Sequence, residues 1–231
     1  MPTLFLNRRN EQLTEFMDDP GCDLAKLNAT YAQFRIVNGL ISGWRRIYKR
    51  KIRPLLKDGS TILDIGCGGG DLLFQLAKWT AADGLSVQIT GIEPDERAIH
   101  YLTTLDLPEN VTVLQQTTSD LVQKESKYDV VLSNHVLHHL DRPTLDHFLD
   151  DSLQLGRSLV LHNDICRNDL AYVGFLPSAV FFRNSFISPD GLRSIRRSFT
   201  MKELKAVVSQ PWKVESMPLF RTLLLRTYDA D

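Results

Sequence analysis

Residues 62–71 read Ile-Leu-Asp-Ile-Gly-Cys-Gly-Gly-Gly-Asp, an apolar run that passes directly into a cluster of glycines. The run predicts a buried strand, and the apolar spacing of Leu72, Leu73 and Leu76 predicts a helix behind the glycines. Glycines at such a junction let the backbone bend sharply and approach a ligand, with free N–H groups at the helix start. This unit therefore indicates an α/β domain that binds a ligand at the carboxyl edge of its sheet.

Short apolar runs and helical patterns alternate on either side of this loop. Strands are expected over 61–65, 87–92, 111–115, 128–133 and 158–162, and helices over 71–79, 95–105 and from about 141 to 153. A helix over 201–208 and strands over 213–216 and 219–227 finish the chain. This order predicts a mainly parallel seven-stranded sheet with helices on both faces and a final antiparallel hairpin.

Two segments lie outside that alternation. Residues 1–56 are expected to form a helical lid segment before the main domain of residues 57–231. The second segment, about 167–200, contains an apolar stretch, 170–182, and a polar loop, 183–200. It is interpreted as an insert that helps to form an acceptor pocket, although a core helix packed on the sheet is the plainer reading of the apolar stretch.

Composition excludes several classes of protein. A formal net charge of −1 argues against a nucleic-acid partner, which usually requires a basic surplus. Three cysteines at irregular spacing predict neither a disulfide framework nor a zinc site, and they favour a reducing cytoplasm. The uncharged run 170–182 is too short to cross a bilayer, so no stable membrane insertion is expected. The oligomeric state stays open.

The residues around the loop narrow the choice of ligand. The dinucleotide-binding pattern G-x-G-x-x-G is not matched, because Asp71 stands where its last glycine would fall. A Walker loop, which binds a nucleoside triphosphate, is excluded because no Gly-Lys-Ser/Thr follows. Asp64, before the first glycine, would repel a pyrophosphate but suits a ligand with ammonium and sulfonium groups. Glu93 follows the second strand, where an acid can accept hydrogen bonds from ribose hydroxyls.

On these residues the sequence resembles the class I methyltransferase superfamily over roughly residues 60–163. Asp64-x-Gly66-x-Gly68-Gly69-Gly70 is similar to its first motif, Glu93 to its ribose-binding acid, and residues 128–140 to its fourth-strand motif. The resemblance implies a Rossmann-like fold and S-adenosylmethionine as cofactor, but it does not specify the acceptor. The cofactor-binding residues that it implies are Asp64, Gly66, Cys67, Gly68, Glu93, Pro94, Ser119, Asp120 and Asn134.

Candidates for catalysis follow the fourth strand. His135 and His139 have the chemistry of a general base, but the Leu-His-His-Leu run also suits a structural role in packing or capping the loop. Substrate contacts are expected from Tyr31, Arg35, Asp164 and Arg167. Asn163 and Asp164 offer oxygen atoms to a metal, but the fourth strand ends in Ser133-Asn134 without a carboxylate, so no metal is expected.

The sequence thus predicts transfer of a methyl group from S-adenosylmethionine to a small molecule, with an oxygen of a phenolic or polyketide-like compound as the favoured acceptor. Carbon methylation of a quinone or prenyl-lipid precursor is an alternative. A non-catalytic binding protein built on the cofactor fold is another, since a fold does not imply a function. An NAD-dependent oxidoreductase is a third.

Overall fold

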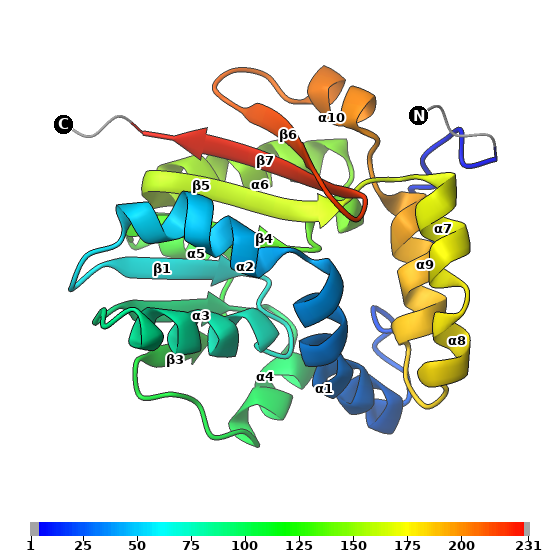
Figure 1. Ribbon diagram of the computed structural model, residues 1–231, viewed down its shortest axis with the longest axis horizontal. Helices are drawn as coiled ribbons and strands as arrows, with labels where there is room; N and C mark the ends of the chain where they lie inside the picture. The colour runs from blue at the N-terminus through cyan, green and yellow to red at the C-terminus, as the bar shows by residue number, and fades with distance from the viewer. Residues whose placement is uncertain (1–4, 229–231) are drawn as a thin grey trace.

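The computed structural model describes residues 5–228. Its seven strands form one sheet in the order β3-β2-β1-β4-β5-β7-β6 (Figure 1). Strands β1 to β5 pair in parallel, whereas β7 pairs antiparallel with both β5 and β6, which confirms the predicted sheet and hairpin. The strands are β1 Thr61–Ile65, β2 Gln88–Ile92, β3 Val111–Leu114, β4 Tyr128–Asn134, β5 Gly156–Ile165, β6 Lys213–Met217 and β7 Arg221–Thr227.

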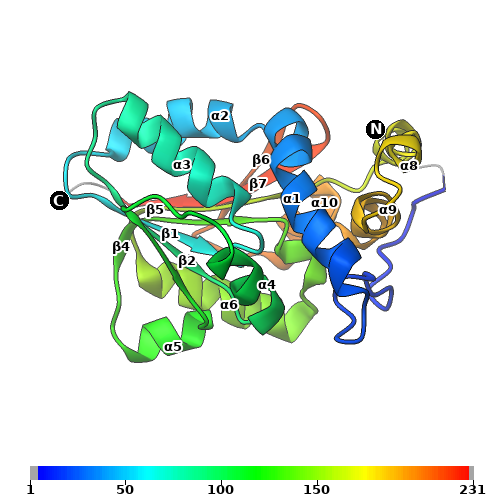
Figure 2. The same cartoon turned by 90° about the horizontal axis from the view of Figure 1, so that it is seen from below.

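Helices cover both faces of the sheet because its central strands are apolar on both sides. Val130 and Leu132 of β4 pack with α2 (Trp44–Ile47) and α3 (Asp71–Ala82). Val131, between them, packs with α5 (Thr118–Gln123) and α6 (Arg142–Leu155) on the opposite face. Figure 2 shows these two helical layers on either side of the strands. Alternation of side chains along one buried strand thus produces the three-layer fold.

The amino-terminal segment differs from the helical lid that the sequence predicts. Residues 1–4 lie outside the described part of the chain, and residues 5–23 contain turns rather than a helix. Their backbone N–H groups are taken by distant carboxylates: Leu6 donates to Asp169, and Met17 donates to Asp190. Asp23 then caps α1, Leu24–Ile41. We call residues 5–22 the strap.

Residues 44–56, which were expected to belong to the lid, pack against the sheet instead. They form α2, the π-helical stretch Tyr48–Ile52 and the 3₁₀ turn Arg53–Leu55. Trp44, Ile47 and Ile52 are almost fully buried in the main core against the sheet. Figure 1 shows α1 beyond the carboxyl ends of the parallel strands, whereas α2 lies over one face of the sheet.

The prediction of a polar loop over 183–200 is wrong, because Ile187–Arg197 forms helix α9. Its inward face mixes apolar Ile187 and Ile195 with buried Asp190, Ser194 and Arg197, so its polarity hides the helical period. It packs beside α7 (Asp169–Phe175) and α8 (Ser178–Phe181), opposite α1 (Figure 1), and α10 (Met201–Val207) follows. Of the described helices, including α4 (Glu96–Thr103), none is long and apolar enough to span a membrane.

Candidate active site

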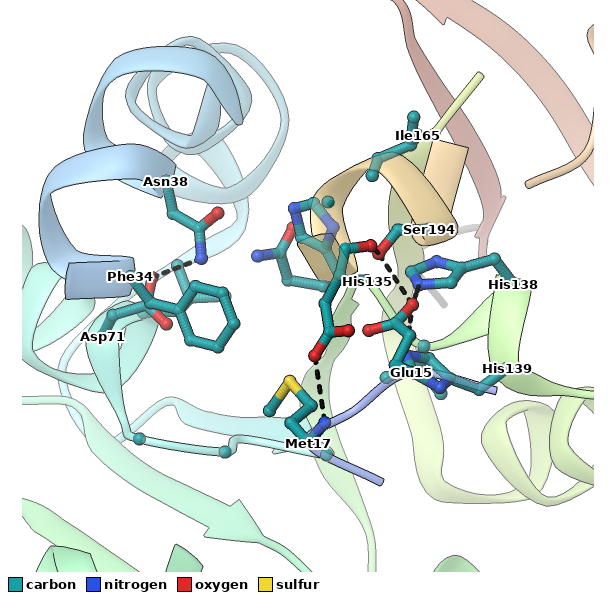
Figure 3. A pocket seen from close by; sticks show the side chains of 18 of the residues that line it. Glu15, Met17, Phe34, Asn38, Asp71, His135, His138, His139, Ile165 and Ser194 are labelled. Atoms are coloured by element: carbon teal, nitrogen blue, oxygen red, sulfur yellow. Dashed lines mark hydrogen bonds and ion pairs between the residues drawn. The ribbon is translucent and has the colours of Figure 1, made fainter. Parts of the chain in front are cut away.

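A cavity of about 760 Å³ lies between the carboxyl edge of the sheet, α1, the strap and the α7–α9 insert (Figure 3). One end is formed by the glycine loop and the ends of β2 and β4. The other end is formed by the strap and α9. Its volume is in the range of small-molecule sites, and much of its wall is apolar, including Phe34, Val37, Ile41, Ile165, Phe175 and Phe186.

The glycine loop is held in a conformation that only glycine adopts readily. Gly66, Gly68 and Gly70 have φ values of +67°, +50° and +77°. Gly69 meets a different constraint: a Cβ there would lie 2.7 Å from Cβ of Tyr31 on α1. The loop therefore turns between β1 and α3 while α1 approaches it closely.

Three carboxylates surround this loop. Asp64 is 2% exposed, and its Oδ1 has no hydrogen-bond partner within the described chain. Glu93 accepts hydrogen bonds from the backbone N–H groups of Gly68 (2.9 Å) and Asp95 (3.1 Å). Asp71 accepts one from Nδ2 of Asn38 (3.1 Å; Figure 3).

Burial raises the pKa of all three loop carboxylates. Burial raises the pKa of Asp64 well above its usual range, and repulsion from Asp71 and Glu93 adds to the effect. Burial also raises the pKa of Glu93, and it raises that of Asp71 to about 6. Within residues 5–228 no ion pair reaches any of the three. A cationic ligand with hydrogen-bond donors fits this end of the cavity.

Most of the residues assigned to the cofactor from sequence line the cavity, but two do not. Cys67, Pro94 and Asn134 do so, with Asp64, Gly66, Gly68 and Glu93. Ser119 instead hydrogen-bonds to Asp151 of α6, and Asp120 belongs to the capping box of α5. Gln116, Thr117 and Thr118 line the cavity in their place. The end of β3 thus reaches the cavity slightly earlier in the chain than the sequence register suggested.

A buried arginine holds the ends of three strands together. Nη1 of Arg221 lies 2.9 Å from Nε2 of His135, Nη2 donates to Oδ1 of Asn134 (2.9 Å), and Nε donates to Oδ1 of Asn163 (3.0 Å). Burial and the charge of Arg221 keep the pKa of His135 well below its usual range. Arg221, which is buried, is therefore part of the site's framework.

Behind His135 lies a buried row of two carboxylates and a histidine. Nδ1 of His138 lies 2.7 Å from Oδ1 of Asp164, and Nε2 lies 3.2 Å from Oε1 of Glu15. Burial disfavours a charged imidazole, but the two carboxylates outweigh it and raise the pKa of His138 to about 9. His138 is accordingly an imidazolium between two anions at neutral pH.

His139 has a similar but more open environment. Its Nδ1 lies 3.2 Å from Oδ2 of Asp18, and its Nε2 lies 3.8 Å from Oε1 of Glu15. Both histidines belong to the short 3₁₀ stretch Leu137–His139 after β4. The structure thus brings His135 and His139, the two histidines proposed for catalysis, to the same cavity wall.

The residues expected to contact substrate do not all line the cavity. Tyr31 lines the cavity, whereas Arg35 lies outside it with its guanidinium over the Phe74 ring. Asp164 lies behind His138. Arg167 is buried between the strap and α10, where it donates to the carbonyl of Leu6 and pairs with Glu203.

Sequence reasoning missed the polar groups at the insert end of the cavity. Glu15, Asp190 and Ser194 all line it, and none lies near the glycine loop or the fourth-strand motif in the sequence. Glu15 and Ser194 are 179 residues apart but joined by a 2.7 Å hydrogen bond. No local pattern signals such a contact.

Comparisons with known proteins agree with this geometry. A family model described as a methyltransferase domain matches residues 62–157. A ubiquinone biosynthesis O-methyltransferase of Paraburkholderia phytofirmans is 27% identical over 168 residues, which is 66% of this chain and 70% of that protein. A tRNA U34 carboxymethyltransferase of Ectopseudomonas mendocina is 31% identical over 137 residues, 56% of this chain and 41% of that protein.

Solved structures share the fold over nearly the whole chain. The plantazolicin methyltransferase BpumL in complex with SAH superposes with a TM-score of 0.65 at 16% identity, covering 93% of each chain. Human N-acetylserotonin methyltransferase in complex with SAM gives 0.62 at 11% identity, covering 90% of this chain and 57% of that one. At these identities the likeness concerns the fold.

The sheet, the glycine loop and these relationships define the class of protein. The chain belongs to the class I S-adenosylmethionine-dependent methyltransferase superfamily. It is an S-adenosylmethionine-dependent methyltransferase, and S-adenosylmethionine is its cofactor.

Proposed function

We propose that this enzyme methylates a hydroxyl oxygen of a small, largely apolar molecule, such as a phenolic or polyketide-like compound. The observation that carries the proposal is one continuous cavity, with three carboxylates at the glycine loop that form no ion pair within the described chain, and with hydrogen-bonding groups in an apolar wall at the insert end. Such a cavity can take a cationic methyl donor and an uncharged acceptor side by side.

The residues of the loop end fit S-adenosylmethionine. Oδ1 of Asp64, buried without a partner in the described chain, suits the ammonium of the methionine portion. Glu93, whose carboxylate already orders Gly68, suits the ribose hydroxyls. We assign the adenine edge to Gln116–Thr118, because Oε1 of Gln116 is also buried without a partner there.

The cofactor supplies a methyl group that is already activated by its sulfonium. This chain's task is therefore to align the acceptor with the methyl, to exclude water and to receive the hydroxyl proton. In our proposal the strap, α1 and the α7–α9 insert form the cover. Arg97 of α4 and Asp190 of α9 both hydrogen-bond to Met17, so the strap is anchored on two sides of the cavity.

The relatives support oxygen as the methylated atom. Several of the curated relatives are named as ubiquinone biosynthesis O-methyltransferases, from bacteria and from Arabidopsis thaliana, at 25–28% identity. The acidic character of the cavity also disfavours acceptors that carry a carboxylate or phosphate.

A screen with methyl-labelled S-adenosylmethionine tests this proposal. Phenols, hydroxyquinones and polyketides are incubated with the enzyme, and products are located by mass spectrometry and assigned by the chemical shift of the labelled methyl. We expect an oxygen-bound methyl on a neutral hydroxyl compound. A carbon-bound methyl would favour the quinone or prenyl-lipid alternative. Tight binding of S-adenosylhomocysteine without any transfer would favour the non-catalytic alternative.

A further inference from the structure

Glu15 belongs to the strap, but its carboxylate lies inside the cavity among residues from other elements (Figure 3). The side chain is only 4% exposed. Its Oε1 accepts hydrogen bonds from Oγ of Ser194 (2.7 Å) and from Nε2 of His138 (3.2 Å). The other oxygen, Oε2, makes no hydrogen bond within the described chain and faces the cavity.

Within the row, two carboxylates share one imidazole, and they differ in how fully their oxygens are hydrogen-bonded. The His138 ring lies between the carboxylates of Asp164 (2.7 Å) and Glu15 (3.2 Å). Asp164 is satisfied by the backbone N–H groups of His138 and Ile165 and by the His138 ring. Glu15 is the member of the row that keeps an unoccupied acceptor oxygen beside the apolar wall.

Two of the three histidines on this wall, His135 and His138, have no ring nitrogen free to accept the hydroxyl proton. Nε2 of His135 already accepts the hydrogen bond of Arg221. Both ring nitrogens of His138 face carboxylates. His139 directs Nδ1 to Asp18, and its Nε2 lies 3.8 Å from Oε1 of Glu15.

We propose that Glu15 is the catalytic base of the reaction, with Ser194 and the Asp164–His138 pair as positioning residues. The inference rests on the proposed function, because it requires a hydroxyl acceptor. The acceptor oxygen forms a bond to the methyl carbon while the methyl–sulfur bond breaks and leaves its electron pair on sulfur. The hydroxyl proton passes to Oε2 of Glu15 and is released to water when product leaves.

The design of the site supports this role. A carboxylate held by two donors on one oxygen has a fixed orientation, so its second oxygen can meet the acceptor hydroxyl in one geometry. Glu15 belongs to the strap, so the same segment supplies the base and covers the acceptor. The Asp190 carboxylate holds this segment in place by accepting hydrogen bonds from the backbone N–H groups of Phe16 and Met17.

Glu15→Gln in the full chain tests the proposal, because glutamine keeps the size and can still accept the bond from Ser194. Glu11→Gln is the matched control: Glu11 is also a strap carboxylate, but it is exposed and pairs with Arg9. The assay uses two phenols from the screen at one pH, one neutral and one already ionised. The wild-type rate establishes the proposed function independently of the variants.

With the neutral phenol, we expect Glu15→Gln to lower kcat by about 10²- to 10⁴-fold. With the ionised phenol, which has no proton to remove, the loss should be less than about tenfold. Binding of S-adenosylhomocysteine by calorimetry should stay within about twofold of the control. Glu15→Asp should retain more activity than Glu15→Gln toward the neutral phenol.

Three outcomes would overturn the assignment. Equal losses with both phenols would make Glu15 merely structural. Full activity of Glu15→Gln together with its loss in His139→Gln would make His139 the base. Glu15, His138 and His139 also have ligand atoms close enough to hold a metal ion, so inactivation by a chelator with recovery on adding a divalent cation would give Glu15 a different role.

If the pH dependence is recorded, the groups that face Glu15 must be considered with it. They are Asp18 on the strap, His138 and His139 after β4, Asp164 of β5, and Asp190 and Arg197 of α9. The comparison of two phenols at one pH avoids their titration.

Discussion

Nη1 of Arg221 lies 2.9 Å from Nε2 of His135, and this contact decides which nitrogen of the histidine carries a proton. An arginine side chain only donates hydrogen bonds, so Nε2 must be the acceptor and the neutral ring carries its proton on Nδ1. Burial and Arg221 together lower the pKa of His135 well below its usual value. The residue that sequence reasoning put forward first as a base thus has its basic nitrogen occupied.

His135→Asn should therefore change the rate without changing its pH dependence. Asparagine tolerates the positive φ of +62° at this position. Loss of one hydrogen bond of about 1 kcal/mol predicts a fall in kcat/KM of roughly fivefold. The check is a pH profile of kcat/KM from pH 5 to 9 for both proteins. Disappearance of an inflection in the variant would restore His135 as the titrating base.

His138 predicts how stability depends on pH. Its folded-state pKa of about 9 is above the ordinary value of 6.5, so the folded protein binds the proton more tightly than the unfolded chain. This contribution, on the order of 3 kcal/mol, is fully present below pH 6.5 and is lost as the pH rises through about 9. Tm of the wild type should fall over this window.

The variant His138→Gln should have a lower Tm at pH 6.5 and a flatter decline toward pH 9.5. His100→Gln serves as the control, because His100 is exposed at the end of α4. Parallel curves for all three proteins, measured by differential scanning calorimetry, would mean that His138 is not an imidazolium in the folded state.

Asp64→Asn should affect the free and the liganded enzyme in opposite directions. Ionised Asp64 is disfavoured in the fold by burial and by the neighbouring carboxylates, so its contribution to stability becomes unfavourable as the pH rises above its ordinary pKa of 3.8. Removing the charge should raise Tm of the free enzyme at pH 7 by roughly 2–4 °C for each kcal/mol relieved.

The same variant should bind S-adenosylhomocysteine at least about tenfold more weakly, because a charge-assisted bond to the ammonium is lost. Thermal shift with and without the ligand measures both effects, with the exposed Asp106→Asn as the control. An unchanged ligand-induced shift would count against the placement of Asp64 at the methionine portion.

Glu93→Ala should raise the dissociation constant of S-adenosylhomocysteine by about 10- to 100-fold. Two effects add: the ribose hydroxyls lose their acceptor, and the backbone N–H of Gly68 loses the bond that orders the loop. The exposed Glu96, three residues later, provides the control Glu96→Ala. Isothermal titration calorimetry measures the affinity of both variants for S-adenosylhomocysteine. Equal affinities would show that Glu93 does not bind the ribose.

The two ends of the cavity differ in how far sequence could predict them. The loop end is local: Asp64 and the glycines are adjacent, and Glu93 is placed beside them by the β1–β2 pairing that the alternation predicts. Ser119 and Asp120 do not line the cavity, because the residues after β3 start a short helix, α5, with a capping box of its own. Periodicity over six residues is too short to read.

The acceptor end depends on contacts between distant segments. Asp190 was expected in a loop, but it lies on a helix because its carboxylate is satisfied by the strap's backbone and not by solvent. Glu15 and His138 are 123 residues apart. Only the tertiary fold brings these charges together, so no pattern of spacing or polarity could have identified them.

The contact between α1 and the glycine loop predicts that alanine substitutions at two glycines change Tm in opposite directions. A Cβ at Gly69 would lie 2.7 Å from Cβ and 3.1 Å from Cα of Tyr31, so Gly69→Ala must displace α1 or the loop. Overpacking of this kind costs about 1–3 kcal/mol, which corresponds to a fall in Tm of roughly 2–10 °C. Binding of S-adenosylhomocysteine should weaken as well, because both displaced segments line the cavity.

Gly39 lies on the exposed side of α1, where an added Cβ would meet no atom within 4 Å. Gly39→Ala should therefore stabilise the helix by about 0.5–1 kcal/mol without changing the affinity for S-adenosylhomocysteine. If Gly69→Ala leaves Tm unchanged or raises it, as Gly39→Ala is expected to do, the close approach of Tyr31 to the loop does not exist in solution.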